Sequence, residues 1–164
     1  MSENDQQTKP IEETEIEGKI IRFNSNGLRP EEFTMVKDVA RKIFTGAKAR
    51  FKYALNRCTF FAEPGYDELR EVQKSSSGVS NPRIEGKDDN PYDQHYWVAF
   101  DVKTERGVLE AVILDPIFGY VGLEANAKDV FPNPDFLEYY TKKRKVEPHK
   151  IAAEGGVRVK TIGI

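Results

Sequence analysis

The sequence of 164 residues has a single cysteine, only two histidines and no long apolar run. One cysteine cannot form an internal disulfide, which excludes a small secreted scaffold held by disulfide bonds. No stretch approaches the roughly 20 apolar residues of a transmembrane helix, and the acidic N-terminus lacks the apolar segment of a signal peptide. We therefore expect a cytoplasmic protein, or one delivered by a route that uses no signal peptide, and no membrane partner.

An excess of positive charge is missing as well. The 25 Lys and Arg residues are balanced by 27 Asp and Glu residues, which argues against a nucleic-acid partner. The 38% apolar content and the length suit one globular domain with its own core. Residues 1–15 are acidic and almost free of apolar side chains, so we expect a disordered acidic N-terminal tail followed by a single domain over residues 16–164.

The pattern of apolar residues predicts both helices and strands. Apolar side chains recur at the helical period from Phe33 to Phe44 and stop at Gly46, and Asn133-Pro134 can cap and start a helix through Tyr140. The polar residues 75–94 are expected to form a long loop. Expected strands cover residues 16–23, 96–102, 108–114 and 157–162. The predicted fold class is α+β, with helices packed on a central antiparallel sheet.

Two of these strands carry a histidine and an aspartate. If residues 103–107 form the hairpin loop, His95 lies directly opposite Asp115, with Cβ atoms about 4.5–5.5 Å apart. A carboxylate at that distance can orient the imidazole and stabilise its protonated form. A register shift of one residue would place the two side chains on opposite faces, whereas a shift of two would keep a common face with a diagonal pairing.

The only cysteine, Cys58, lies upstream of this hairpin and supplies the nucleophile of a predicted Cys58–His95–Asp115 triad. The thiolate is the reactive species, and a helix N-terminus and a protonated histidine both favour it. Thr59 to Glu63 can form a first helical turn, which Pro64-Gly65 is expected to interrupt.

Further candidates surround the predicted triad. The backbone N–H of Cys58 is a candidate donor to the oxyanion, and the side-chain amides of Asn56 and Gln94 are candidate donors to the substrate. Trp97 is expected to form one side of the site. The residues 75–94 precede His95 and can cover the site as a lid, or form a plain disordered insertion.

Other readings of the same residues remain open. A lone cysteine is often a small buried apolar residue, and Leu-Asp-Pro is a common ending of a strand before a turn. A zinc site of Cys58, His95, Asp115 and His149 is chemically possible, but the sequence has no CxxC or HxxxH pair. We therefore expect no metal and no cofactor.

The residues His95-Tyr96-Trp97-Val98 and Leu114-Asp115-Pro116 resemble the His-x-Trp-Val … Leu-Asp-Pro signature of transglutaminase-like domains, which belong to the papain-like thiol enzymes. The resemblance covers about residues 54–119. It implies a papain-like fold with the nucleophilic cysteine at the start of a long helix, from which the expected break at Pro64-Gly65 departs.

The resemblance also implies an activity. Members of this group transfer acyl groups through a thioester as cysteine proteases, deamidases, amidases or transglutaminases, so a protein or peptide bearing glutamine or another amide is the expected substrate. The group also contains catalytically inactive domains. The alternative is therefore a binding module that keeps the papain-like fold and acts by protein–protein recognition.

Overall fold

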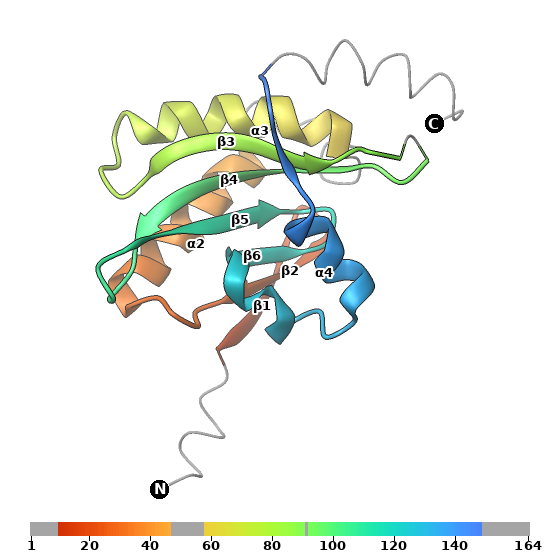
Figure 1. The fold of residues 1–164 in the computed structure, drawn as a ribbon. Helices are drawn as coiled ribbons and strands as arrows, with labels where there is room; N and C mark the ends of the chain where they lie inside the picture. The colour runs from red at the N-terminus through yellow and green to blue at the C-terminus, as the bar shows by residue number, and fades with distance from the viewer. Residues whose placement is uncertain (1–9, 47–57, 91, 149–164) are drawn as a thin grey trace, which may run out of the picture.

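The computed structural model describes residues 10–46, 58–90 and 92–148. These residues form a seven-stranded sheet with helices on both faces (Figure 1). The strands are β1 (Ile11–Ile16), β2 (Lys19–Asn24), β3 (Ser80–Lys87), β4 (His95–Lys103), β5 (Leu109–Asp115), β6 (Tyr120–Leu123) and β7 (Arg144–Val146). The helices are α2 (Pro30–Thr45), α3 (Cys58–Gln73), the 3-10 helix η2 (Glu124–Asp129) and α4 (Pro134–Thr141).

The expected α+β class is confirmed, but the sheet is mixed rather than purely antiparallel. Its order is β1-β2-β6-β5-β4-β3-β7. The strands β2 and β6 run parallel, and all other neighbours are antiparallel. The chain leaves β2 through α2 and α3 and reaches β6 only after β3, β4 and β5, so the parallel pair is joined by a long connection rather than a hairpin.

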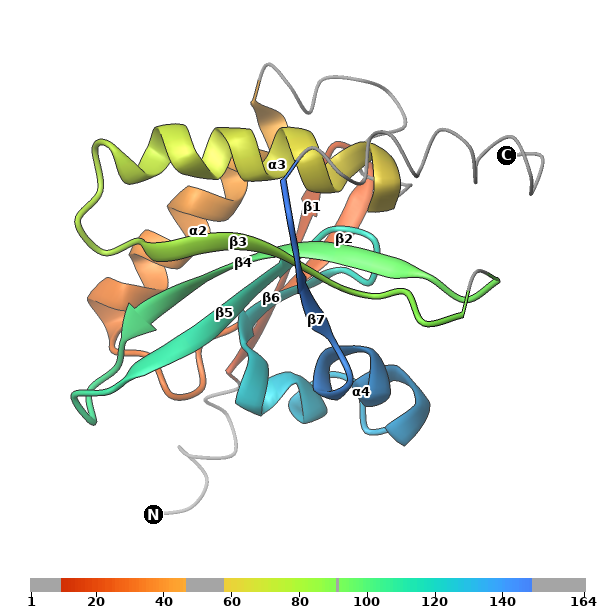
Figure 2. The ribbon, with the colours of Figure 1, turned by 45° about the horizontal axis from the view of Figure 1, so that its top comes forward.

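Helices cover both faces of the sheet (Figure 2), and the buried apolar residues of the described part of the chain form three clusters. α2 and α3 cover one face of the sheet, whereas η2 and α4 cover the other. The largest cluster lies beneath α2 and α3, and the second cluster contains the buried rings of Trp97, Tyr120 and Tyr140. Strand β4 is therefore covered on both sides, which explains its nearly continuous run of apolar residues.

Helix α2 ends just before Gly46, as the sequence predicts, and begins at Pro30, one turn before the predicted apolar pattern. Pro30 occupies the first turn, where its missing N–H costs nothing. The side chain of Glu32 accepts a hydrogen bond of 2.9 Å from the backbone N–H of Arg29. Val36, Ile43 and other members of the predicted apolar stripe are fully buried against the sheet.

The register of the β4–β5 hairpin differs by two residues from the direct pairing expected from the sequence. Val98 pairs with Leu114 and Phe100 pairs with Val112, because β4 continues to Lys103 and the loop begins one residue later than expected. His95 consequently lies diagonal to Asp115 and on the same face of the sheet, which keeps the two side chains within reach.

The predicted disorder is wrong for residues 11–15. Residues 11–15 were expected to be disordered, but they form most of β1, which pairs with β2 along its whole length. Glu17 and Gly18 have φ values of 50° and 81°, as in a two-residue hairpin turn that twists with its strands. The expected strand over residues 16–23 is therefore interrupted by this turn. Backbone pairing, rather than apolar content, holds the segment.

Pro64 lies inside α3 without ending it, so the predicted break is wrong. An interior proline removes one main-chain hydrogen bond and crowds the carbonyl four residues earlier. Complete burial of Phe61, Ala62 and Leu69 against the sheet offsets this loss. A continuous helix of 16 residues therefore begins at Cys58.

The predicted loop over residues 75–94 is also wrong in its middle. Its residues 80–87 form β3, which pairs with β4 on one side and β7 on the other. Polar and charged residues make this strand hard to recognise in the sequence. The strand can contain them because they are paired, as Arg83 and Glu85 are at 2.7 Å. The expected strand over residues 157–162 lies outside the described residues.

Candidate active site

Asp115 ends β5 and is completely buried. Its Oδ1 accepts hydrogen bonds of 3.0 Å from the backbone N–H groups of Ile117 and Phe118. Its Oδ2 lies 2.6 Å from Nε2 of His95 and accepts a hydrogen bond of 2.7 Å from the hydroxyl of Tyr140. Four donors therefore satisfy the two oxygens, as a buried carboxylate requires.

His95 begins β4, and its ring is enclosed by aromatic side chains. The ring stacks on Phe118 with centroids 3.9 Å apart, and it lies 5.3 Å from Trp97 and 5.8 Å from Tyr139. Only 3% of the residue is exposed. Since Nε2 faces Asp115, the other ring nitrogen, Nδ1, is the one left for a reaction partner.

The surroundings of His95 favour its protonated form. Burial by itself lowers the pKa of the imidazole. The negative charge of Asp115, the hydrogen bond to it, and the interaction with Cys58 act in the opposite direction and outweigh burial. Together they raise the pKa of His95 from 6.5 to about 9. The ring therefore carries a proton at neutral pH.

Cys58 lies at the first position of α3 and is partly buried against the cluster that contains Tyr96. Its side chain lies close enough to the His95 ring to help raise the pKa of that imidazole, and Sγ lies 3.9 Å from the backbone carbonyl oxygen of Gln94. No acidic residue lies in the first turn of α3, so no carboxylate of that turn offsets the positive end of the helix at which Cys58 lies. The three predicted triad residues thus come together from a helix and two strands.

The other predicted site residues have mixed outcomes. Trp97 lies against His95, but it is completely buried and its Nε1 donates a hydrogen bond of 3.1 Å to Glu85. It therefore supports the imidazole from inside the protein and offers no surface to a substrate. Gln94 is half-buried and presents its backbone carbonyl to the sulfur. Asn56 lies outside the described residues.

Tyr140 and Phe118 are the site residues that the sequence did not reveal. Burial, followed by the charge of Asp115, raises the pKa of Tyr140 well above its usual value, so its hydroxyl remains a donor to Asp115. The available sequence signal for Tyr140 was its spacing. It shares one face of a helix with Phe136 and Tyr139. The sequence could not tell that this face meets Asp115.

An open pocket of about 390 Å³ borders the candidate triad on the α4 side. The ring of Phe118, which stacks on His95, forms part of its wall. The pocket is lined by three aromatic and three acidic residues: Phe118, Phe136, Tyr139, Asp93, Asp135 and Glu138.

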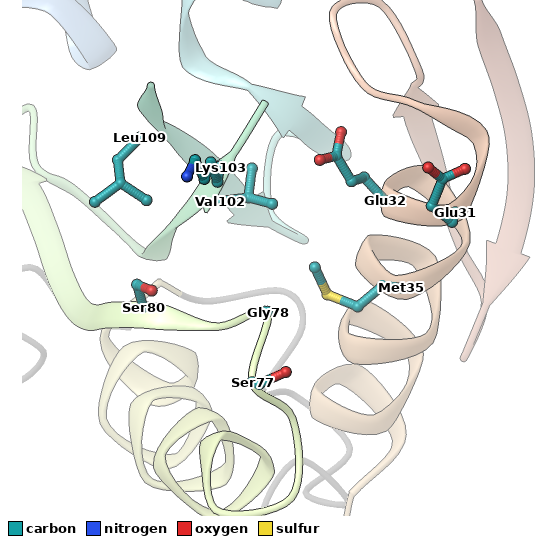
Figure 3. Close-up of a pocket in the computed structure, with 9 residues that line it drawn as sticks. All are labelled: Glu31, Glu32, Met35, Ser77, Gly78, Ser80, Val102, Lys103 and Leu109. Carbon is teal, nitrogen blue, oxygen red and sulfur yellow. The ribbon is translucent and has the colours of Figure 1, made fainter. Parts of the chain in front are cut away.

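A second pocket, of about 410 Å³, lies at the other end of β4 (Figure 3). The start of α2, the residues before β3, and the β4–β5 hairpin line it, and Met35, Gly78 and Lys103 are among its residues. His95 and Lys103 are the two ends of β4, which are about 26 Å apart at the usual rise of about 3.3 Å per residue. This pocket is therefore separate from the candidate triad.

Neither a metal centre nor a membrane span is found among the described residues. No group of three or more His, Cys, Asp or Glu side chains in these residues has an arrangement that can hold a metal ion. None of the helices in the same part of the chain combines the length and apolar character needed to cross a bilayer.

Comparison with protein-family models, with curated proteins and with solved structures gave no match.

Proposed function

We propose that this protein is a thiol-dependent acyl-transfer enzyme that attacks a carboxamide or peptide carbonyl. The observation that carries the proposal is the buried His95–Asp115 pair at 2.6 Å, with Cys58 near enough to influence the pKa of the same imidazole. A nucleophile, a base and a group that orients the base are the parts such a reaction needs. We further propose that α3 and strands β4 and β5 are the core of a papain-like, transglutaminase-like domain, with the cysteine at the start of a continuous helix.

In the proposed reaction, the Cys58 thiolate forms a bond to the carbonyl carbon of the substrate. The His95 imidazolium then gives its proton to the leaving nitrogen as the carbon–nitrogen bond breaks, which leaves a thioester on Cys58. Water or an amine attacks this thioester, and neutral His95 accepts the proton of the attacking group. The products are the released amine or ammonia and an acid or a new amide, and the Cys58 thiolate and His95 imidazolium are regenerated.

The high pKa of His95 supports this assignment of roles. An imidazole that is protonated at neutral pH stabilises a neighbouring thiolate and is ready to act as an acid toward the leaving group. Asp115 stays fixed through the two turn N–H groups and Tyr140, so it orients Nε2 without taking the proton away.

The alternative function is a non-catalytic binding module with the same architecture. Its supporting observation is the burial of His95, of which 3% is exposed beneath the Phe118 ring. Reactivity of the thiol separates the two proposals, because a binding module has no need for an activated sulfur.

Alkylation of Cys58 provides the first test. The chain has one cysteine and two histidines, so iodoacetamide labelling reports a single site and His149→Gln serves as the matched control for His95→Gln. A simple thiol with a pKa near ~8.5 has well under about 1% thiolate at pH 6. We expect Cys58 to react at least about tenfold faster than such a thiol at this pH. His95→Gln should remove the advantage, and His149→Gln should retain it.

A rate at pH 6 equal to that of a simple thiol, unchanged by His95→Gln, would contradict the enzyme proposal. If the thiol is activated, incubation with glutamine-containing peptides distinguishes the reaction types. Release of ammonia with conversion of glutamine to glutamate indicates a deamidase, cleavage of the backbone indicates a protease, and incorporation of an added amine indicates a transglutaminase. Cys58→Ser should abolish all three.

A further inference from the structure

The pocket beside α4 shares a wall with the candidate triad. The ring centroids of Phe118 and His95 lie 3.9 Å apart. On the pocket side of Phe118, the ring centroid of Phe136 lies 5.3 Å from that of Phe118. One or two residues of extended chain span this separation, at about 3.3 Å per residue. The pocket therefore lies within one or two residues' reach of the imidazole that faces Asp115.

The lining combines aromatic faces with negative charge. Three of the six lining residues are acidic and none is basic. Two nearby lysines are held by acids at the rim. Lys142 lies 3.5 Å from Glu138, and Lys87 lies 3.0 Å from Asp89 and 3.9 Å from Asp93.

The carboxylates outnumber these two lysines. Asp89, Asp93, Asp135 and Glu138 contribute four negative charges against two positive ones. The charge of His95 is matched by that of Asp115, so it does not alter this balance.

Tyr139 lies within the negative potential of the same carboxylates. Its hydroxyl donates to Asp93 at the rim. This hydrogen bond, partial burial, and the charges of Asp93, Glu138 and Asp135 raise the pKa of Tyr139 to about 12. The same field that disfavours a phenolate attracts a cation.

We propose that this pocket is a substrate subsite for a positively charged side chain, lysine or arginine, that neighbours the amide attacked by Cys58. The inference rests on the proposed acyl-transfer function. The aromatic rings contact the aliphatic stem and attract the cation through their faces, and Asp135 and Glu138 supply charge. The side chain is held non-covalently, and selectivity for basic sequences follows.

Binding of small probes tests the subsite without relying on catalysis. N-acetyl-lysine methylamide and N-acetyl-arginine methylamide are titrated into the full chain, with the norleucine analogue as the uncharged isostere of lysine. Shifts of the ring signals of Phe118, Phe136 and Tyr139 are followed by NMR. We expect both basic probes to bind at least about tenfold more tightly than norleucine, since the net excess of two negative charges, at about 6 Å in water, contributes about threefold per charge.

Charge variants locate the effect. Asp135→Asn and Glu138→Gln should each weaken lysine binding about threefold and leave norleucine binding unchanged. Glu71→Gln is the matched control, because Glu71 lies on α3, across the sheet from α4, and pairs with Lys74 at 3.0 Å. It should alter neither. Phe136→Leu keeps an apolar wall and removes the ring face, so it should weaken lysine binding selectively.

Tighter or equal binding of norleucine would show an ordinary apolar pocket and overturn the proposal, as would the absence of ring shifts with any probe.

A kinetic experiment then compares peptides that carry lysine or norleucine beside the reactive glutamine. Turnover without a preference for lysine would refute the subsite alone, whereas lysine binding without thiol reactivity or turnover would refute the acyl-transfer function and leave a cation-binding pocket.

Discussion

The protonation of His95 is the property of the site most open to a direct physical test. Asp115→Asn keeps the size of the side chain and one oxygen for the N–H groups of Ile117 and Phe118. It removes the negative charge that faces Nε2. Burial of the ring remains, and burial is the largest influence and lowers the pKa of His95.

The size of the effect follows from the pKa values. His95 titrates at about 9 in the native protein, and near or below the ordinary value of about 6.5 once the carboxylate is gone. A difference of about 2.5 units corresponds to about 3 kcal/mol of net stabilisation of the protonated ring, which is what remains after burial has opposed Asp115 and Cys58.

The same shift couples stability to pH. The pKa of His95 is higher in the folded chain than in the unfolded chain. Its contribution to folding is therefore fully present below about pH 6.5 and is lost as the pH rises through about 9. The wild-type free energy of unfolding should fall by about 3 kcal/mol across this window, and that of Asp115→Asn should stay nearly flat.

NMR titration of the imidazole Cε1–H signals from pH 5 to 10 measures the pKa values, with His149→Gln assigning the two histidines. Urea unfolding of both proteins at pH 6, 7.5 and 9 measures the linkage. Two results would refute the reasoning: a wild-type His95 that titrates below pH 7, or an Asp115→Asn protein in which His95 still titrates near 9.

Further predictions concern the neighbours of the triad. Tyr140→Phe removes one of the donors to a buried carboxylate and should lower the free energy of unfolding by about 1–3 kcal/mol, as urea unfolding will show; an unchanged midpoint would mean that the hydroxyl is not needed. Pro64→Ala should raise stability by about 1–3 kcal/mol, because it restores a main-chain donor within α3. Gly65→Ala should lower it, since a Cβ there would lie 3.2 Å from Val98; thermal unfolding of this adjacent pair tests both signs. The kcat/KM of an identified substrate should decline on the alkaline side with an apparent pKa near 9, as the His95 proton is lost; a flat profile from pH 7 to 10 would contradict the acid role.

Much of the site could be predicted because its residues lie in simple local patterns. His95 and Asp115 end two apolar runs joined by a short reversal, so even a register shift of two residues left them on one face. The position of α4 was equally clear, because Asn133 caps its first turn.

Errors arose where tertiary contacts outweighed local preference. Pro64 does not break α3 because the surrounding apolar side chains are buried against the sheet. Residues 80–87 looked like a loop because the buried charges of β3 are neutralised by partners distant in sequence. Arg83, for example, pairs with Asp101 at 3.0 Å. The contact between Tyr140 and Asp115 spans 25 residues and has no local signature.

The parallel pairing of β2 with β6 has a consequence for the order of folding. Strands β3 to β6 are neighbours in both sequence and sheet, so they assemble through short loops. The β1–β2 hairpin must instead find β6, and the paired residues Arg22 and Tyr120 are almost a hundred positions apart. Closing so long a loop is slow. We therefore expect refolding kinetics with two phases, in which the strands that carry His95 and Asp115 become protected from hydrogen exchange before the N-terminal hairpin docks.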